Sequence, residues 1–383
     1  MQKILLIVTC LYCLSSCNAQ PASKKNTKPV NTKKMEDGKD YIILKRFRAV
    51  DKQGFNQPVE VASYLLPANW QVNTSVQWNP ALRCIIDMVQ ISLLAKSPDG
   101  VFELMVFPTT QFDWSNDQRD LADLNKNPLR HACNMAPPLE AAGYINTYIA
   151  PYLKATVKSV SPVEELQQQL NLNVQQLQNI AMQAGNNMLH YKATSAEAKL
   201  QFGDGKEGIA FCAIVQTTTQ IPGMPIATYQ CKVPIRIVVK YTNGNESMAR
   251  KIVSTFTSSL RNNPSWSNAV QKMMSNVIQR GQAALGQQIE INHKAQQEIS
   301  NGIVRNWENR QSNSGGGTNA EGFNQLINGV ETWKDGSGNK VELTSGYTNA
   351  WSRGDGSYYL SNNPANDPNV ELGGTQSWSR LKQ

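Results

Sequence analysis

Ile209-Ala210-Phe211-Cys212-Ala213-Ile214-Val215-Gln216-Thr217-Thr218 is the stretch that decides the fold of this chain. Apolar and β-branched residues fill it, and such residues favour a β-strand. A second stretch of the same kind, 227–239, follows after Gln220-Ile221-Pro222-Gly223-Met224-Pro225, whose proline and glycine residues favour a turn. The two stretches therefore predict an antiparallel β-hairpin.

The residues that precede this hairpin match a nucleotide-binding pattern by spacing alone. Gly203-Asp204-Gly205-Lys206-Glu207-Gly208 has the glycine spacing of a dinucleotide-binding loop. That loop needs a helix after it, so that the helix N-terminus faces the pyrophosphate. Here a strand follows, so we expect a hairpin turn and no nucleotide cofactor.

Segments on both sides of the hairpin alternate between strand and helix patterns. Together they predict an α+β fold, a mixed α/β body with an antiparallel sheet. The clearest helix is 164–184, in which Leu166, Leu170, Leu177, Ile180 and Ala184 line one face. Strands are expected over 41–50, 59–66, 82–95, 100–107 and 191–202, and further helices over 138–157 and 247–260.

The N-terminus has the pattern of an export signal. A basic start precedes an apolar run of about ten residues, which is too short to span a bilayer as a helix. Leu14-Ser15-Ser16-Cys17 closes the run and resembles the lipobox of bacterial lipoproteins. The resemblance implies a signal peptide over 1–16, acylation of Cys17 (palmitate among the acyl chains) and a membrane anchor in the cell envelope, with the outer membrane favoured. The alternative is ordinary secretion with cleavage after Ala19.

Composition divides the rest of the chain into further segments. The formal net charge is +8, of which Lys3 and residues 18–40 contribute four, so that residues 41–383 are only mildly basic and no nucleic-acid partner is expected. The expected organisation is a lipidated disordered tether (17–40), an α+β domain (41–263), a long helical segment (264–311), a Gly/Ser linker (312–318) and a small aromatic β-rich module (319–383).

Two further resemblances concern parts of this body. The arrangement Leu66-Pro67-Ala68-Asn69-Trp70, Ser97-Pro98-Asp99-Gly100 and Phe107-Pro108 is similar to the start of PsbP-type α/β folds. The C-terminal pattern, from Leu343-Thr344-Ser345-Gly346-Tyr347 to Gly356-Ser357-Tyr358-Tyr359-Leu360-Ser361, is similar to the ends of uncharacterised bacterial envelope proteins. The second likeness implies a recurrent module without indicating an activity.

Four cysteines remain once the leader and Cys17 are set aside, and an even number in an exported chain suggests disulfides. Folding the hairpin about Ile221-Pro222 sets Cys212 opposite Cys231, so a disulfide is predicted between them. Cys84 and Cys133 then pair by default, and four buried thiols are the alternative. Their spacing does not suit zinc.

Catalytic signatures are weak throughout. The histidines His131, His190 and His293 do not lie at metal-ligand spacing, and no Gly-x-Ser-x-Gly elbow occurs. His131 beside Cys133 could suggest an activated thiol, but an exported thiol is usually oxidised. We therefore expect no catalytic residue, no metal and no cofactor.

The aromatic tail is the best candidate for a binding surface. Its hairpin contains Trp351, Arg353, Tyr358 and Tyr359, and aromatic faces can contact a sugar ring or a peptide. A small module also needs large aromatics as its core, and this explanation of their density is favoured over a binding platform. The expected function is therefore a non-enzymatic, membrane-anchored envelope lipoprotein that binds a partner protein or an envelope polymer. The rivals are an envelope hydrolase and an assembly subunit joined through the long helices.

Overall fold

A computed structural model describes residues 41–79, 84–126, 133–220, 222–279, 330–372 and 377–383. Antiparallel sheets and several helices make up these residues, so the fold is α+β, as the sequence predicted. The signal peptide, the tether, the 312–318 linker and the helical segment beyond Gln279 lie outside the described residues.

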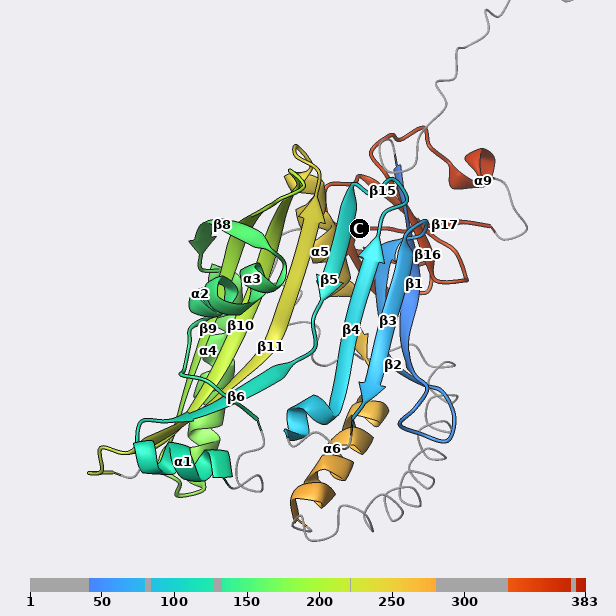
Figure 1. Ribbon diagram of the computed structural model, residues 1–383. Helices are drawn as coiled ribbons and strands as arrows, with labels where there is room; N and C mark the ends of the chain where they lie inside the picture. The colour runs from blue at the N-terminus through green and yellow to red at the C-terminus, as the bar shows by residue number, and fades with distance from the viewer. Residues whose placement is uncertain (1–40, 80–83, 127–132, 221, 280–329, 373–376) are drawn as a thin grey trace, which may run out of the picture. The chain divides into compact units, whose positions relative to one another are not determined.

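The larger sheet has nine strands, and the predicted hairpin lies near its middle (Figure 1). All of its pairings are antiparallel except that of the short strands β6 and β7. β6 runs beside the first half of β11, and β7 pairs with β6. The main path is β3 (Gln71–Trp78), β4 (Val89–Lys96), β5 (Phe102–Val106), β11 (Ala227–Tyr241), β10 (Glu207–Gln220), β9 (Leu189–Phe202) and β8 (Ala155–Ser161), with β6 (Thr110–Ser115) and β7 (Asn134–Met135) beside it.

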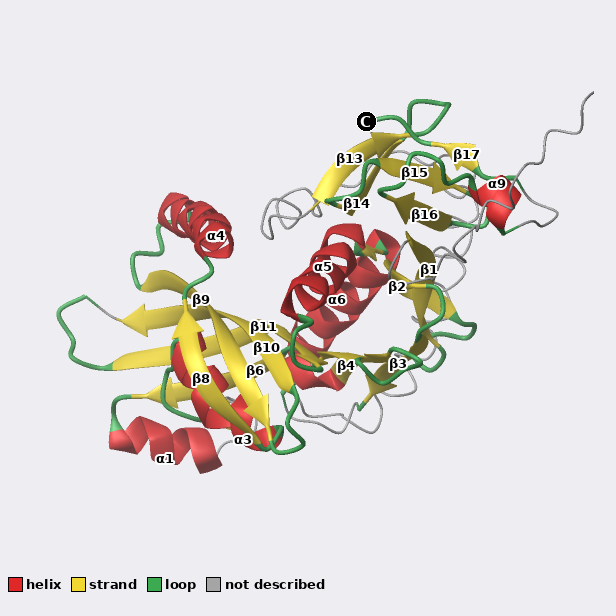
Figure 2. Cartoon of the chain, turned by 90° about the horizontal axis from the view of Figure 1, so that it is seen from above, coloured by secondary structure: helices red, strands yellow, loops and turns green. Residues whose placement is uncertain are grey.

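β10 is covered on both faces, which explains its unbroken apolar sequence. Phe211 belongs to a core that includes α5 (Glu246–Ser259) and the start of α6 (Pro264–Gln279). Cys212 belongs to a second core on the opposite face, under α2 (Ala141–Tyr144), η2 (Ile145–Ile149) and α3 (Ala150–Tyr152). Figure 2 shows these helices on the two sides of the sheet. The turn at Gly203–Gly208 is a hairpin turn, with Gly205 at φ 80°.

A smaller sheet joins the two ends of the described chain. Strand β16 pairs with β1 from Ser361 opposite Tyr41 to Ser357 opposite Lys45. The linker suggested that the C-terminal β-rich module is isolated from the body. The structure instead joins the two, because β1 of the body pairs with β16 of the module in one sheet. The order is β12 (Arg261–Asn262), β2 (Val59–Pro67), β1 (Tyr41–Asp51), β16 (Ser357–Ser361), β15 (Asn349–Ser352) and β17 (Ser379–Arg380), and β13 (Val330–Lys334) with β14 (Lys340–Thr344) forms a separate pair.

Two predicted segments differ in detail from the structure, and several elements were not predicted. The helix expected over 138–157 ends at Tyr152, because Lys154 adopts φ 52° and the chain continues as strand β8. The strand expected over 82–95 begins with a turn of 3₁₀-helix, η1 (Ile85–Met88). Helix α1 (Gln118–Lys126) and strands β3, β6 and β8 were not expected.

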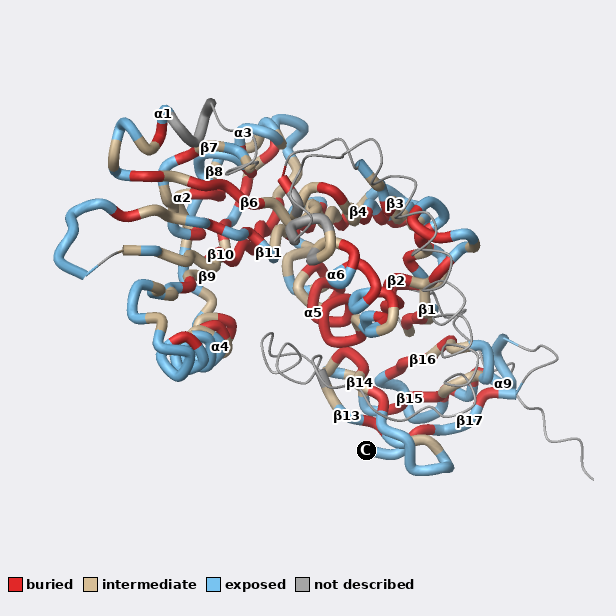
Figure 3. The backbone as a smooth tube through the Cα atoms, turned by 90° about the horizontal axis from the view of Figure 1, so that it is seen from below, coloured by how far each residue is buried: buried red, intermediate tan, exposed pale blue. Residues whose placement is uncertain are grey.

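Helix α4 (Glu164–Gln183) forms as predicted, but its apolar face is only partly buried. Leu166 and Leu170 pack against β9 and β10, in a small core with Ala193 and Ala213. Leu177 and Ile180 are exposed, although the sequence placed them on the buried face. The second half of the helix thus has apolar residues at exposed positions. Figure 3 shows the exposed stretches of α4 in pale blue.

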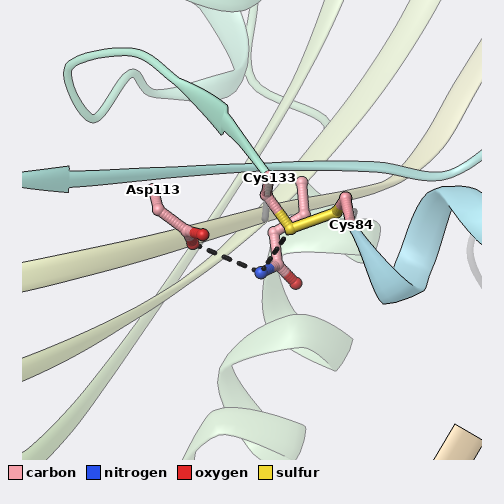
Figure 4. Close-up of a disulfide and its surroundings, with 4 residues drawn as sticks. Cys84, Asp113 and Cys133 are labelled. Atoms are coloured by element: carbon pink, nitrogen blue, oxygen red, sulfur yellow. Dashed lines mark hydrogen bonds between the residues drawn. A yellow bond between two sulfur atoms is a disulfide. The ribbon is translucent and has the colours of Figure 1, made fainter. Parts of the chain in front are cut away.

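The cysteines pair only in part as predicted. Cys84 and Cys133 form a disulfide, and Gln111 Nε2 lies 3.3 Å from Cys133 Sγ and 3.2 Å from Asp113 Oδ1 (Figure 4). The disulfide predicted between Cys212 and Cys231 is wrong, and both thiols are free and buried.

The strand register explains this error. Gln220 pairs with Ala227, so the hairpin turns about Gly223-Met224 and not about Ile221-Pro222. A register shift between Ala213 and Val215 adds to the displacement. Cys212 consequently lies opposite Arg236, and Cys231 lies opposite Gln216.

Candidate functional site

A polar hollow lies beside the smaller sheet, with a cavity volume of about 330 Å³. We call it the tryptophan hollow, because Trp351 of β15 and Trp378, just before β17, contribute its two large aromatic rings. Helix α9 (Pro368–Glu371) and the residues before it supply one wall. The hollow is lined by Trp351, Pro364, Ala365, Asn366, Asp367, Asn369, Trp378 and Arg380.

The two tryptophans belong to a buried aromatic cluster. Tyr359 packs edge-on against both rings, with centroid distances of 5.4 Å to Trp351 and 6.1 Å to Trp378. Tyr41 of β1 stacks on Tyr359 at 5.0 Å. The tyrosine hydroxyl donates to Glu371, and burial is the main cause of the raised pKa of Tyr359. This cluster holds the indoles in one orientation, so the wall of the hollow is rigid.

These contacts agree with the favoured expectation that most aromatics of the tail form a core, and they leave little of an exposed aromatic platform. Trp351 and Tyr359, both expected to bind a partner, are 5% and 0% exposed. Tyr358 points to the other face of the sheet, where it is half-buried against the core around Leu44 and Leu360. Core packing therefore explains most of the aromatic density in the tail, and only Trp351 of the predicted set lines the hollow.

Two arginines lie over the two indoles. The guanidinium of Arg380 is 5.6 Å from the Trp351 ring and donates to Asn349 Oδ1 at 2.5 Å. The guanidinium of Arg353 is 4.8 Å from the Trp378 ring and pairs with Asp355 at 2.6 Å. Cation–π contacts of this kind orient a long side chain at a surface. The hydrogen bond from Arg353 is also the largest cause of the lowered pKa of Asp355.

The Arg353-Gly354-Asp355 sequence is explained by its turn. The Gly356 N–H donates to the Arg353 carbonyl at 3.0 Å, and Gly356 has φ 81°. Because Asp355 is held by Arg353 and by the Ser357 backbone N–H, the turn uses these side chains internally. A receptor is not needed to account for their presence.

Side-chain amides and one carboxylate complete the hollow. Asn369 accepts from the Trp378 backbone N–H at 2.6 Å and donates to its carbonyl at 3.0 Å, which ties α9 to β17. Asp367 Oδ1 caps α9 by accepting from the Asn369 backbone N–H. The buried Asn366 donates through Nδ2 to the Ser361 hydroxyl at 2.7 Å and to the Tyr359 hydroxyl at 3.2 Å. The hollow therefore brings side-chain amides and the Asp367 carboxylate together with the Arg380 guanidinium.

The resulting site is neutral and polar. Asp367 and Arg380 carry opposite charges, and the other lining residues carry none. Planar polar groups beside indole rings suit a ligand with many hydroxyls and no net charge, such as a sugar. Asn366, Asp367 and Asn369 were not predicted as site residues, because 362–369 has the composition of a solvated turn. Trp378 and Arg380 were not predicted either, because no local pattern relates them to Trp351. The only local signal was Asp367-Pro368, which is typical of a helix start.

Other predicted features give no second site. In the part of the chain that the structure describes, no group of three or more His, Cys, Asp or Glu residues could hold a metal ion. Cys133 is in a disulfide, and His131 and the lipidation residue Cys17 lie outside the described residues. Within the same described ranges, no helix has both the length and the apolar character needed to cross a bilayer.

Comparisons with known proteins found no relative. No family model matches this sequence, and neither the curated proteins nor the solved structures gave a match.

Proposed function

We propose that this chain is a non-enzymatic lipoprotein of the bacterial cell envelope that binds a neutral envelope polysaccharide in the tryptophan hollow. The observation that carries the proposal is the neutral, aromatic and amide-lined hollow of about 330 Å³. Sugar binding needs hydrogen-bond donors and acceptors close to an apolar ring, and Trp351, Trp378 and Arg380 with Asp367 supply both. A polymer also suits an open hollow, because several weak contacts can add along a chain.

The export part of the proposal rests on the N-terminal sequence and on one cross-link. The Cys84–Cys133 disulfide supports an oxidising compartment, where such bonds form and persist. Acyl chains on Cys17 would keep the protein at the membrane, with the outer membrane favoured.

Binding is tested with the full chain and polysaccharide isolated from the envelope. Arg380→Ala removes the donor over Trp351, and Asp367→Asn keeps the cap on α9 while removing the charge. We expect each substitution to weaken co-sedimentation with the polymer about tenfold, as the loss of a charged hydrogen bond does. Lys382→Ala is the matched control, since Lys382 is exposed and does not line the hollow. Equal binding by all four proteins would reject the polysaccharide proposal.

The anchor is tested separately by metabolic labelling with palmitate. We expect the wild-type chain to carry the label in the membrane fraction and Cys17→Ser to lose it. An unlabelled wild-type chain cleaved after Ala19 would support ordinary secretion and reject the lipid anchor.

A further inference from the structure

Two segments of the chain contain no charged residue. Residues 166–191 and 208–231 lack Asp, Glu, Lys and Arg entirely, although the whole chain has 37 basic and 29 acidic residues. The first segment covers most of α4 and the start of β9, and the second covers most of β10 and the start of β11.

Hydrogen bonds bring these two segments together at one end of the larger sheet. The Asn186 N–H donates to the Ala181 carbonyl at 2.9 Å, which folds the chain back at the end of α4. The Gln220 N–H then donates to the Met188 carbonyl at 2.9 Å, and Gln220 Nε2 reaches the Met224 carbonyl at 3.0 Å. The end of α4, the connection to β9 and the tip of the β10–β11 hairpin are thus contiguous.

This end of the sheet is unusually apolar at its surface. We call it the apolar end, and its Ile180, Met182 and Met224 are 62%, 52% and 50% exposed. It holds six of the twelve large apolar side chains that are exposed among the described residues. The six are Leu177, Ile180, Met182, Met188, Met224 and Ile226. Figure 3 shows the exposed outer side of α4 and the exposed hairpin tip. Single exposed apolar side chains are normal on a protein surface, but a contiguous cluster of them marks an interaction site.

Charged groups border the apolar end without entering it. Glu165, Lys192 and Lys232 end the charge-free segments. On the side of α1, Asn116 Nδ2 donates to the Pro225 carbonyl at 2.9 Å, and the neighbouring Asp117 pairs with Arg119. An apolar centre with a charged border is the usual composition of a protein interface, and methionine is enriched in such centres.

We infer that the apolar end is an interface between two copies of this chain. A two-fold contact places the same patch against itself, so any net charge on the patch would repel its own copy. The chain has a formal net charge of +8, whereas the apolar end has no charge to repel or to desolvate. An anionic lipid surface is the less suitable partner, because the lysines and arginines that recognise its headgroups are missing here.

The test uses two differently tagged copies of the full chain, expressed together and purified through one tag. Wild-type copies should co-purify, and the double variant Ile180→Lys/Met224→Lys should lower recovery of the second tag at least tenfold. Both positions are exposed, so circular dichroism should show an unchanged fold. Val370→Lys is the matched control, because Val370 is 81% exposed and lies outside the apolar end. If the lysine variant does not fold, Ile180→Gln/Met224→Gln replaces it with the same expected loss.

Two results would overturn the inference. The first is a failure of the wild-type copies to co-purify, or equal recovery of the second tag for the wild type and the double variant. The second is a double variant that keeps self-association but loses binding to vesicles of uncharged phosphatidylcholine, since a lipid surface would then be the partner.

Discussion

Asp51 is the residue at which three elements of the body meet. Its carboxylate is fully buried at the end of β1 and accepts hydrogen bonds from two indoles, Trp78 Nε1 at 2.8 Å and Trp266 Nε1 at 2.9 Å. It also accepts from the backbone N–H groups of Gln53 and Gly54. Because Trp78 ends β3 and Trp266 begins α6, this one side chain connects the two sheets and a helix.

Replacing Asp51 should destabilise the protein strongly. Asp51→Ala would leave four donors without an acceptor, at a cost of about 3 kcal/mol in the free energy of unfolding. Asp51→Asn should lower the free energy of unfolding nearly as much, because the amide N–H₂ would face the N–H donors that now bind the carboxylate. Urea denaturation followed by tryptophan fluorescence measures both. Lys52→Ala, at an exposed neighbour, is the control, and a loss below about 0.5 kcal/mol for Asp51→Ala would contradict this account.

The two free thiols predict a loss of stability at high pH. Burial raises the pKa of Cys212 and of Cys231 from 9.0 to about 12. Above pH 9 the unfolded thiols release protons that the folded thiols retain, so the folded state binds more protons and stability falls as pH rises. The contribution is complete below pH 9 and is lost as pH approaches about 12.

Unfolding free energies measured between pH 8 and pH 11 check this prediction. Cys212→Ala/Cys231→Ala should show a shallower alkaline decline than the wild type, because the two titrating groups are gone. An identical slope in both proteins would mean that the thiols do not contribute.

At the scale of elements, the pairing of β16 with β1 has the widest consequence. Leu360 of β16 is fully buried and shares a core with Leu44 of β1 and Leu65 of β2. These contacts join residues that are about 300 positions apart in the chain, and they make the last strands part of the folded body.

A destabilising substitution in β16 should therefore lower the free energy of unfolding of the whole body. We expect Leu360→Ala to cost about 3 kcal/mol, since it leaves a cavity in this core. Unfolding should remain one transition that is seen equally by circular dichroism and by fluorescence. Val370→Ala, at an exposed position of α9, should cost almost nothing. A separate early transition of the C-terminal strands would instead support an independent module.

At the scale of the whole molecule, the disulfide makes the stability of the protein depend on the compartment in which it folds. Cys84 and Cys133 are 49 residues apart in sequence and join η1 to the segment before β7. Closing a loop of this length stabilises a protein by about 4 kcal/mol, chiefly through the unfolded state. Exported protein should gain this stability, and protein kept in the cytoplasm should not.

Thiol counting in the denatured protein tests this link between export and stability. Exported chains should show two alkylatable thiols, Cys212 and Cys231, when no reductant is added. A version that begins at Asn18 and stays in the cytoplasm should show four and should melt at a lower temperature. Four thiols in the exported protein would contradict the oxidised structure.

The sequence by itself determined those features that depend on neighbouring residues. The β10–β11 hairpin, helix α4, the turn at Gly203–Gly208 and the α+β class follow from local patterns, because strand and helix periodicity and turn residues act over a few positions. The sequence also showed that the tail is rich in aromatic residues. It did not show which of them are buried in the core and which line the tryptophan hollow.

Only the tertiary structure decided the features that depend on distant residues. The register that separates Cys212 from Cys231 is set by the position of the turn and by a bulge, and a small shift changes every partner. The pairing of β16 with β1, and the meeting of Trp378 with Trp351, join segments that no local pattern relates. The exposure of Ile180 on α4 arises for the same reason, since the helix pattern predicts an apolar face but only the extent of the sheet decides how much of that face is covered.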